Sequence, residues 1–196
     1  MTQDPDAASE GEFLNGRFLI AMPGISDPRF ERAVILVCVH APEQAMGLRV
    51  NLPHDDMSLD AILEKLGVEG RARESRQRVL KGGPVERDRG YVLHSDDYQV
   101  PGSTLHICDG LCLTATREIL QALTVGHEQP SKAVLALGYA GWGAGQLEIE
   151  LRDNVWLTGP CDPDLVFDAD HESKWERALA RMGVSSAMLS GQAGQA

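Results

Sequence analysis

The side chains of Cys38 and His40 form the most reactive pairing that the sequence offers. They lie two residues apart in an apolar run, so both would project from the same face of a β-strand. A thiol beside an imidazole can act as a nucleophile activated by a general base. A cysteine in such a run is more commonly an inert part of the core, and His40 would then end the strand. We therefore expect no catalytic residue.

A second group of side chains has the chemistry of a metal site. His94, Asp96 and Asp97 are close in sequence, and His106 follows. Imidazole and carboxylate ligands together suit a divalent ion. A histidine and acids beside a surface hairpin are more often simply solvated. We expect no metal and no cofactor.

The four cysteines do not have the spacing of a zinc site or of a C-x-x-C motif; they are Cys38, Cys108, Cys112 and Cys161. Cys108 and Cys112 share the parity of a strand, but Asp109-Gly110 between them predicts a turn. Their pairing under oxidation stays open. The first residues are acidic, unlike a signal peptide, and no apolar run approaches the ~18 residues of a membrane span. We expect a cytoplasmic protein with reduced thiols.

Two clusters of glycine offer main-chain donors for a small ligand. One is Gly82-Gly83-Pro84, and the other lies in residues 138–145, where four glycines surround Trp142. The apolar residues 133–137 predict a strand, and the glycines predict a turn that leads into a helix. Such a turn can direct free N–H groups at an anion or a carbonyl. Neither the nucleotide-loop motif nor the G-x-G-x-x-G motif is present.

These clusters could converge on one ligand pocket. The predicted ligand-binding residues are His40, Asn51, Gly82, Gly83, Gly141, Trp142 and Gly143. In the alternative interpretation, which we favour, the glycines only allow strands and a helix to pack closely.

Positive charge is concentrated in residues 71–89. This segment has seven Arg or Lys residues and three acids, a net charge of +4 in a chain whose net charge is −11. Direct DNA binding through Arg71, Arg73, Arg76 and Arg78 is therefore an alternative function. The overall negative charge repels a phosphate backbone, which argues against it.

The composition predicts one folded domain. The chain has 196 residues, of which 43% are hydrophobic and 24% charged, which is enough for a core. We expect the domain to span residues 13–183, between disordered tails at 1–12 and 184–196. Strands are predicted at 17–21, 32–40, 46–52, 91–94, 105–107, 111–113 and 155–157, and helices at 58–66, 114–125, 146–152 and 173–183. Tight turns rather than crossovers join adjacent strands, which predicts an α+β fold.

The order of several motifs carries a family resemblance. The motifs are Gly16-Arg-Phe-Leu-Ile-Ala-Met-Pro23, Met46-Gly-Leu-Arg-Val-Asn51, Gly82-Gly83-Pro84-Val85, Arg89-Gly-Tyr-Val-Leu-His94, Gly138-Tyr-Ala-Gly-Trp-Gly143 and Asn154-Val-Trp-Leu157. Together they resemble the YqgE/AlgH family of bacterial proteins, also called UPF0301 or DUF179, over roughly residues 14–183. The resemblance implies a single domain whose mixed, largely antiparallel sheet curls into a partial barrel with helices packed around it.

The resemblance implies no particular reaction. The family's common label, transcriptional regulator, comes from a link to alginate regulation rather than from a DNA-binding surface. Two positions depart from the family pattern: Val39 replaces a frequent acid, and Leu52 replaces a frequent base, so position 52 has no cationic role here. Our leading hypothesis is a non-enzymatic cytoplasmic protein that binds and regulates through a protein partner. Besides direct DNA binding, the second alternative to this hypothesis is a ligand sensor or enzyme that uses the glycine-rich pocket.

Overall fold

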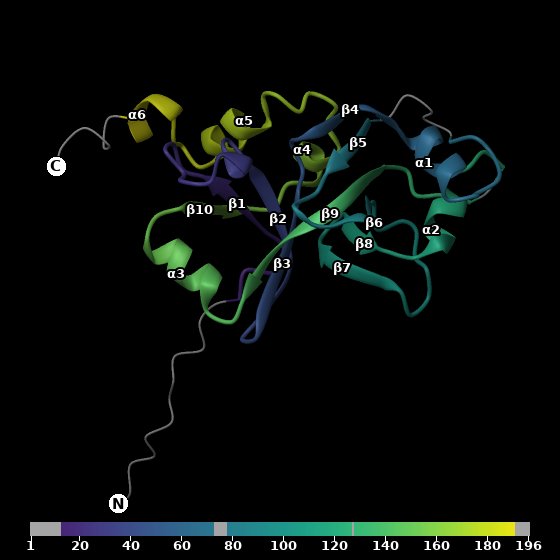
Figure 1. The fold of residues 1–196 in the computed structure, drawn as a ribbon, viewed down its shortest axis with the longest axis horizontal. Helices are drawn as coiled ribbons and strands as arrows, with labels where there is room; N and C mark the ends of the chain where they lie inside the picture. Colours follow the sequence, from purple (N-terminus) through teal and green to yellow (C-terminus); the bar gives the residue numbers. More distant parts are fainter. Residues whose placement is uncertain (1–12, 73–77, 127, 191–196) are drawn as a thin grey trace, which may run out of the picture.

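The structure is a computed structural model that describes residues 13–72, 78–126 and 128–190. The ten strands in these ranges form one curled sheet, which makes a half-barrel (Figure 1). The strands are β1 (Arg17–Ala21), β2 (Val34–Ala41), β3 (Gln44–Arg49), β4 (Pro53–Ser58), β5 (Arg78–Lys81), β6 (Val85–His94), β7 (Thr104–Cys108), β8 (Leu111–Thr114), β9 (Ala133–Gly143) and β10 (Trp156–Pro160). The predicted α+β fold with a largely antiparallel sheet is confirmed.

The strands follow the order β10-β1-β2-β3-β9-β6-β8-β7, and β4 and β5 lie off this path. Each pairing along the path is antiparallel. β4 pairs with β5, which lies parallel to the first half of β9. The apolar strand β2 lies between β1 and β3 with six buried residues in its eight, as its β-branched sequence predicts.

Within the described residues, six α-helices and one 3-10 helix, η1 (Pro28–Phe30), cover the sheet. The α-helices are α1 (Leu59–Lys65), α2 (Arg117–Ala122), α3 (Gln146–Arg152), α4 (Pro163–Phe167), α5 (Lys174–Arg181) and α6 (Ser186–Ser190). In Figure 1, α1 and α2 lie together at one end of the molecule and α3 at the other, while α4, α5 and α6 lie along a third side. No helix within the described residues has the length and apolar character that a membrane span requires.

Residues 186–190 of α6 belong to the segment that the sequence assigns to the C-terminal tail. Val184 and Leu189 pack against the main core cluster. The tail residues 1–12 and 191–196 lie outside the described residues.

The glycine-rich segment is strand rather than turn, which corrects the prediction. β9 continues through Gly138, Gly141 and Trp142 to Gly143. Antiparallel pairing of this second half with β3 provides hydrogen-bond partners for its backbone groups, so the strand extends beyond the apolar run. The predicted helix follows at α3, after Gly145 in the left-handed conformation.

One predicted helix start is also wrong. Thr114 ends β8 and is buried, and the N-cap of α2 is Thr116 instead. Ser173 is the N-cap of α5 as predicted, but its own conformation is helical and its side chain makes no capping hydrogen bond. The Ser173 hydroxyl donates instead to the Asp170 carboxylate at 2.6 Å. In contrast, Ser58 caps α1 as predicted, accepting from Ala61 N.

Candidate functional site

β9 changes its partner strand at Gly138, and this fork positions the site. On one edge of β9, Ala136 and Leu137 pair with β5, whereas Ala140 to Gly143 pair with β3. Gly138 has a φ of 71°, which a residue with a Cβ rarely adopts. The glycine therefore allows β9 to bend where one neighbour replaces the other.

The Gly82-Gly83-Pro84 turn fills this fork. Gly82 N donates to Leu137 O at 2.8 Å, and Gly82 O accepts from Arg49 N at 2.8 Å, so the turn bridges β9 and β3. A Cβ on Gly82 would lie 2.3 Å from Gly138 O, and one on Gly83 would lie 2.0 Å from the carbonyl carbon of Tyr139. The predicted close approach of main chain to main chain is thus present at this turn.

A cavity of about 390 Å³ lies beside the turn, and we call it the basic pocket. It is lined by Arg29, Phe30, Arg49, Leu52, His54, Lys81, Gly83, Pro84, Arg87 and Leu137. Of these described lining residues, four are Arg or Lys and none is acidic. The pocket thus concentrates positive charge in a chain whose net charge is −11.

Arg49 is the buried cation of this pocket. Its residue is 8% exposed, and its Nη1 and Nη2 donate to Arg29 O at 2.7 Å and Glu31 O at 3.0 Å. Its Nε donates to Asn51 Oδ1 at 3.1 Å. Burial lowers the pKa of Arg49 to about 10, so the guanidinium is charged at neutral pH. Its protein partners are neutral oxygens, which orient the charge without neutralising it.

Asn51 is the residue that fixes Arg49. Its Oδ1 also accepts from Val34 N at 3.0 Å, and its Nδ2 donates to Arg32 O at 2.8 Å. The amide therefore joins the end of β3 to the start of β2 and to the η1–β2 connection. In this geometry Asn51 supports the guanidinium of Arg49, and its role as a ligand contact stays a prediction.

The other cations of the pocket differ in how firmly they are paired. Lys81 Nζ lies 3.3 Å from the exposed Asp55, and Arg29 pairs with Asp27 at 2.6 Å. Exposed pairs of this kind contribute roughly 0–1 kcal/mol and compete weakly with a ligand. Within the described residues, Arg87 has no ion pair or hydrogen bond from its exposed side chain. Among the described residues, Arg87 is thus an unpaired cation at the pocket.

His54 adds a neutral donor or acceptor to this lining. Burial lowers its pKa, and the charge of Lys81 lowers it further, against the opposing effect of Asp55. The imidazole is therefore uncharged at neutral pH.

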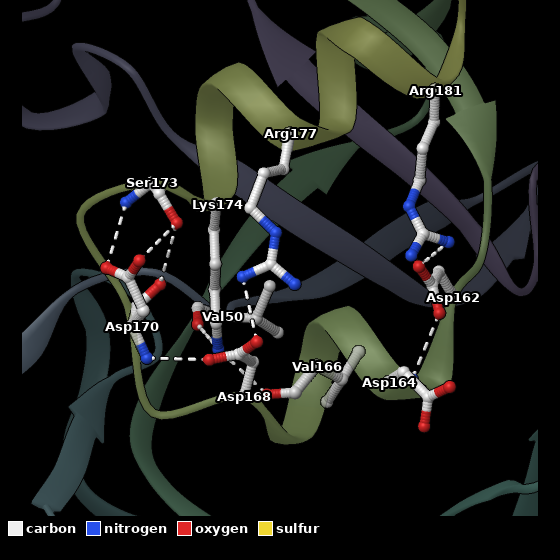
Figure 2. A network of polar contacts seen from close by, with 10 residues as sticks. All are labelled: Val50, Asp162, Asp164, Val166, Asp168, Asp170, Ser173, Lys174, Arg177 and Arg181. Atoms are coloured by element: carbon white, nitrogen blue, oxygen red, sulfur yellow. Dashed lines mark hydrogen bonds and ion pairs between the residues drawn. The ribbon is translucent and has the colours of Figure 1, made fainter.

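A polar network holds the residue after β3 to the C-terminal helices (Figure 2). Lys174, which is fully buried, donates from Nζ to Val50 O at 2.9 Å and to Val166 O at 2.8 Å. Burial lowers its pKa to about 8. Because Val50 lies between Arg49 and Asn51, this contact fixes the backbone that carries both pocket residues. Arg177 pairs with Asp168 at 2.8 Å at the edge of the same network.

The structure separates the seven residues predicted to bind a ligand. Gly83 lines the basic pocket, and Asn51 and Gly82 are hydrogen-bonded to its lining residue Arg49. Gly141 and Trp142 line an adjacent hollow of about 250 Å³. Gly143 ends β9, where its N–H donates to Gln146 Oε1 at 3.1 Å and is not free for a ligand.

Trp142 is held by a carboxylate in that adjacent hollow. Its Nε1 donates to Glu150 Oε2 at 2.8 Å, and Trp156 Nε1 donates to the same oxygen at 2.7 Å. The indole rings meet edge to face at 6.3 Å between centroids. Glu150 therefore joins α3 to β9 and β10.

His40 lies away from both hollows. Its Nδ1 accepts from Leu14 N at 3.0 Å, which leaves Nε2 to donate to Glu148 Oε1 at 2.8 Å. The pKa of Glu148 is lowered by its own backbone N–H and by His40. The imidazole thus connects the chain before β1 to α3.

Cys38 and His40 make separate contacts. Cys38 belongs to the main core cluster, and its Sγ donates to Leu36 O at 3.5 Å. Burial raises its pKa to about 12, which suppresses the nucleophilic thiolate. The register of β2 against β3 shifts between Val37 and Val39, so simple alternation does not describe this part of the strand.

The residues with metal-ligand chemistry have other partners. His94 is fully buried, with Nδ1 donating to Ser95 O and Nε2 accepting from the Thr114 hydroxyl, both at 2.9 Å. Asp96 accepts from Gly110 N, and Asp97 accepts from the Ser95 hydroxyl. The described residues contain no group of three or more His, Cys, Asp or Glu side chains placed to hold a metal.

The predicted nucleic-acid residues are only partly described. Arg73 and Arg76 lie outside the described residues, and Arg71 and Arg78 are both exposed. Direct DNA binding through this segment stays a prediction.

Sequence reasoning missed the cations that line the basic pocket. Arg29, Arg49 and Arg87 are far apart in the chain and come from η1, β3 and β6. The only local signal was the position of Lys81 and Arg87 on either side of the Gly82-Gly83-Pro84 turn.

The fold and the site define an α+β protein whose half-barrel sheet carries a basic pocket at the fork of a long strand. The chain matches the AlgH-like family DUF179 over residues 18–187 and belongs to that family. A UPF0301 protein from Caulobacter vibrioides is 54% identical over 187 residues, covering 95% of this chain and 96% of the relative. One from Methylobacterium sp. is 48% identical over 202 residues, covering 100% and 96%.

Two solved structures are similar to this chain. The solution structure of the AlgH protein from Pseudomonas aeruginosa has a TM-score of 0.76 and 39% identity, with 100% of each chain covered. The crystal structure of a Corynebacterium diphtheriae protein has a TM-score of 0.71 and 19% identity, covering 92% of this chain and 93% of that one. At that identity the second match shows the fold alone.

Proposed function

We propose that this protein is a non-enzymatic binding protein that takes up a small anion in the basic pocket and signals its presence to a protein partner in the cytoplasm. One observation carries the proposal. The guanidinium of Arg49 is buried beside a cavity whose described lining has no carboxylate. Because a buried charge without a counter-charge is costly, an anion that enters the pocket gains an unusually strong partner.

The lining also limits the chemistry of the ligand. Phe30, Leu52, Pro84 and Leu137 supply apolar surface next to the cations. A cavity of about 390 Å³ is at the small end of known ligand pockets. The pocket therefore suits a compact organic phosphate or carboxylate that carries an apolar group.

Calorimetric titration with three probes that share a six-carbon chain tests this proposal. Hexyl phosphate and hexanoate are anions, and hexanol is the neutral control. We expect the anions to bind at least about tenfold more tightly than hexanol, because only they pair with Arg49. Equal affinity for all three would overturn the proposal.

Matched variants locate the binding. We expect Arg49→Gln to weaken hexyl phosphate binding more than tenfold and Arg87→Gln to weaken it about threefold, while Arg152→Gln on exposed α3 leaves it unchanged. Circular dichroism reports whether Arg49→Gln still folds, and Arg87→Gln keeps the test valid if it does not. Unchanged binding in Arg87→Gln and in folded Arg49→Gln would show that the anion binds elsewhere.

A further inference from the structure

The curl of the sheet brings its two end strands, β7 and β10, close together. Arg17 of β1 pairs with Pro160 of β10. Gly16 therefore lies across from Cys161, the residue that follows β10. A Cβ on Gly16 would be 2.5 Å from Ile107 O and 3.5 Å from Cys108 Cβ. The start of β1 therefore lies beside both Cys108, the last residue of β7, and Cys161, the first residue after β10.

A second contact also brings the β7 end of the sheet close to the β10 end. A Cβ on Gly110, in the turn between β7 and β8, would meet Pro163 at 3.6 Å. Pro163 begins α4, two residues after Cys161. Both Cys108 and Cys161 pack against the edge of the main core cluster and are partly exposed, whereas Cys38 and Cys112 are buried.

Both thiols thus lie beside Gly16, where each affects the ionisation of the other. The neighbouring Cys161 lowers the pKa of Cys108, and the neighbouring Cys108 raises the pKa of Cys161, which keeps its proton. Burial raises the pKa of Cys112 instead. Cys108 is thus the thiol that most readily becomes a nucleophile, and Cys161 is its neighbour.

We infer that Cys108 and Cys161 form a reversible disulfide when the protein meets hydrogen peroxide. The Cys108 thiolate attacks one peroxide oxygen, which breaks the O–O bond and gives a sulfenic acid and hydroxide. The Cys161 sulfur then attacks Cys108 Sγ, its proton leaves with the departing hydroxyl as water, and the S–S bond forms. The sum converts two thiols and one peroxide into one disulfide and two waters.

The disulfide would join the two ends of the strand order and close the half-barrel covalently. Such transient disulfides are the kind found in reducing compartments. The pair also differs from the pairing of Cys108 with Cys112 that the sequence left open. Cys112 pairs across the ladder with His94 and His106, and Leu111 lies opposite Cys108.

Peptide mapping of the full-length protein tests this inference. The protein is treated with an equimolar amount of hydrogen peroxide, and its remaining thiols are blocked with N-ethylmaleimide before digestion and mass spectrometry. We expect one linked peptide pair that contains Cys108 and Cys161, with Cys38 and Cys112 still carrying the blocking group. We also expect the melting temperature to rise by about 5 °C or more and to return on reduction.

Two single variants separate the roles of the thiols. In Cys161→Ser, dimedone should trap a sulfenic acid on Cys108, whereas Cys108→Ser should give no dimedone adduct at Cys161. A disulfide to Cys112, a disulfide between two chains, or four blocked thiols after peroxide treatment would each overturn the inference.

Discussion

Arg49 shows how much of this site depends on a single side chain. Three of its N–H groups are used by Arg29 O, Glu31 O and Asn51 Oδ1, so its position is fixed before any ligand arrives. A side chain ordered in advance loses little entropy on binding. The residue identity alone does not reveal this, because an arginine in a strand is usually a solvated surface residue.

Glu150 is the residue that orders the glycine-rich end of β9, and this gives a first prediction. Glu150→Ala leaves the buried indole N–H groups of Trp142 and Trp156 without their acceptor and should lower the free energy of unfolding by about 2 kcal/mol. Glu150→Gln keeps an oxygen acceptor and should cost less than half as much. Urea unfolding followed by tryptophan fluorescence measures both. Equal losses in the two variants would show that the carboxylate is not the shared acceptor.

His171 gives a prediction for acid. Burial and the charge of Lys174 lower its pKa to about 4, and burial also lowers the pKa of His94. Between the ordinary histidine pKa of about 6.5 and these lower values, the unfolded chain binds more protons than the folded one. The stability that these two neutral histidines contribute is therefore fully present above pH 6.5 and is lost as the pH falls toward 4.

The His171 contribution to this loss should be about 1–2 kcal/mol after allowing for partial exposure. Urea unfolding at pH 7, 6, 5 and 4.5 measures it, with His171→Gln as the comparison because glutamine does not titrate. The variant should show a shallower pH dependence. An identical slope in wild type and variant would contradict the assignment.

At the scale of elements, the second half of β9 is where the structure differs from what the local sequence predicts. The apolar residues 133–137 correctly predict a strand, and the glycines after them correctly predict close approach. The predicted turn is wrong because pairing with β3, a strand about a hundred residues earlier, extends β9 to Gly143. Non-local pairing of this kind has no signature in the glycine run itself.

The close approach at this fork gives a third prediction. Gly83→Ala places a Cβ about 2.0 Å from Tyr139 main chain and should destabilise the protein by more than about 3 kcal/mol. Gly143→Ala, at the end of the same strand, is the matched control, since a Cβ there has nothing within 4 Å and should change stability by less than about 0.5 kcal/mol. Melting temperatures of the two variants compare them, and similar values would contradict tight packing at the turn.

At the scale of the whole molecule, the sequence predicted the class of fold but not the arrangement of the site. Periodicity and turn residues place most of the strands and the helices α1, α3 and α5. They do not place β4, whose sequence Pro-His-Asp-Asp-Met-Ser has little β-propensity and is held by pairing with β5. The basic pocket was equally hidden, because its cations meet only after the sheet curls.

The charge distribution of the whole molecule follows from this arrangement. A net charge of −11 repels anions at long range, so the basic pocket must act at short range and through buried hydrogen-bonding groups. Salt should therefore weaken hexyl phosphate binding only modestly, by less than about threefold between 50 and 200 mM, since Arg49 is buried. A steep salt dependence in the same calorimetric titration would instead indicate exposed basic residues such as those of segment 71–89.

Nuclear magnetic resonance titration of the labelled protein with hexyl phosphate tests anion binding in the basic pocket most directly. We predict saturable shifts of the Arg49 Nε–H signal and of the backbone amides of His54, Gly83 and Arg87, with little change around His40 and Gly143. The absence of saturable shifts, or shifts centred on residues outside the basic pocket, would contradict the account.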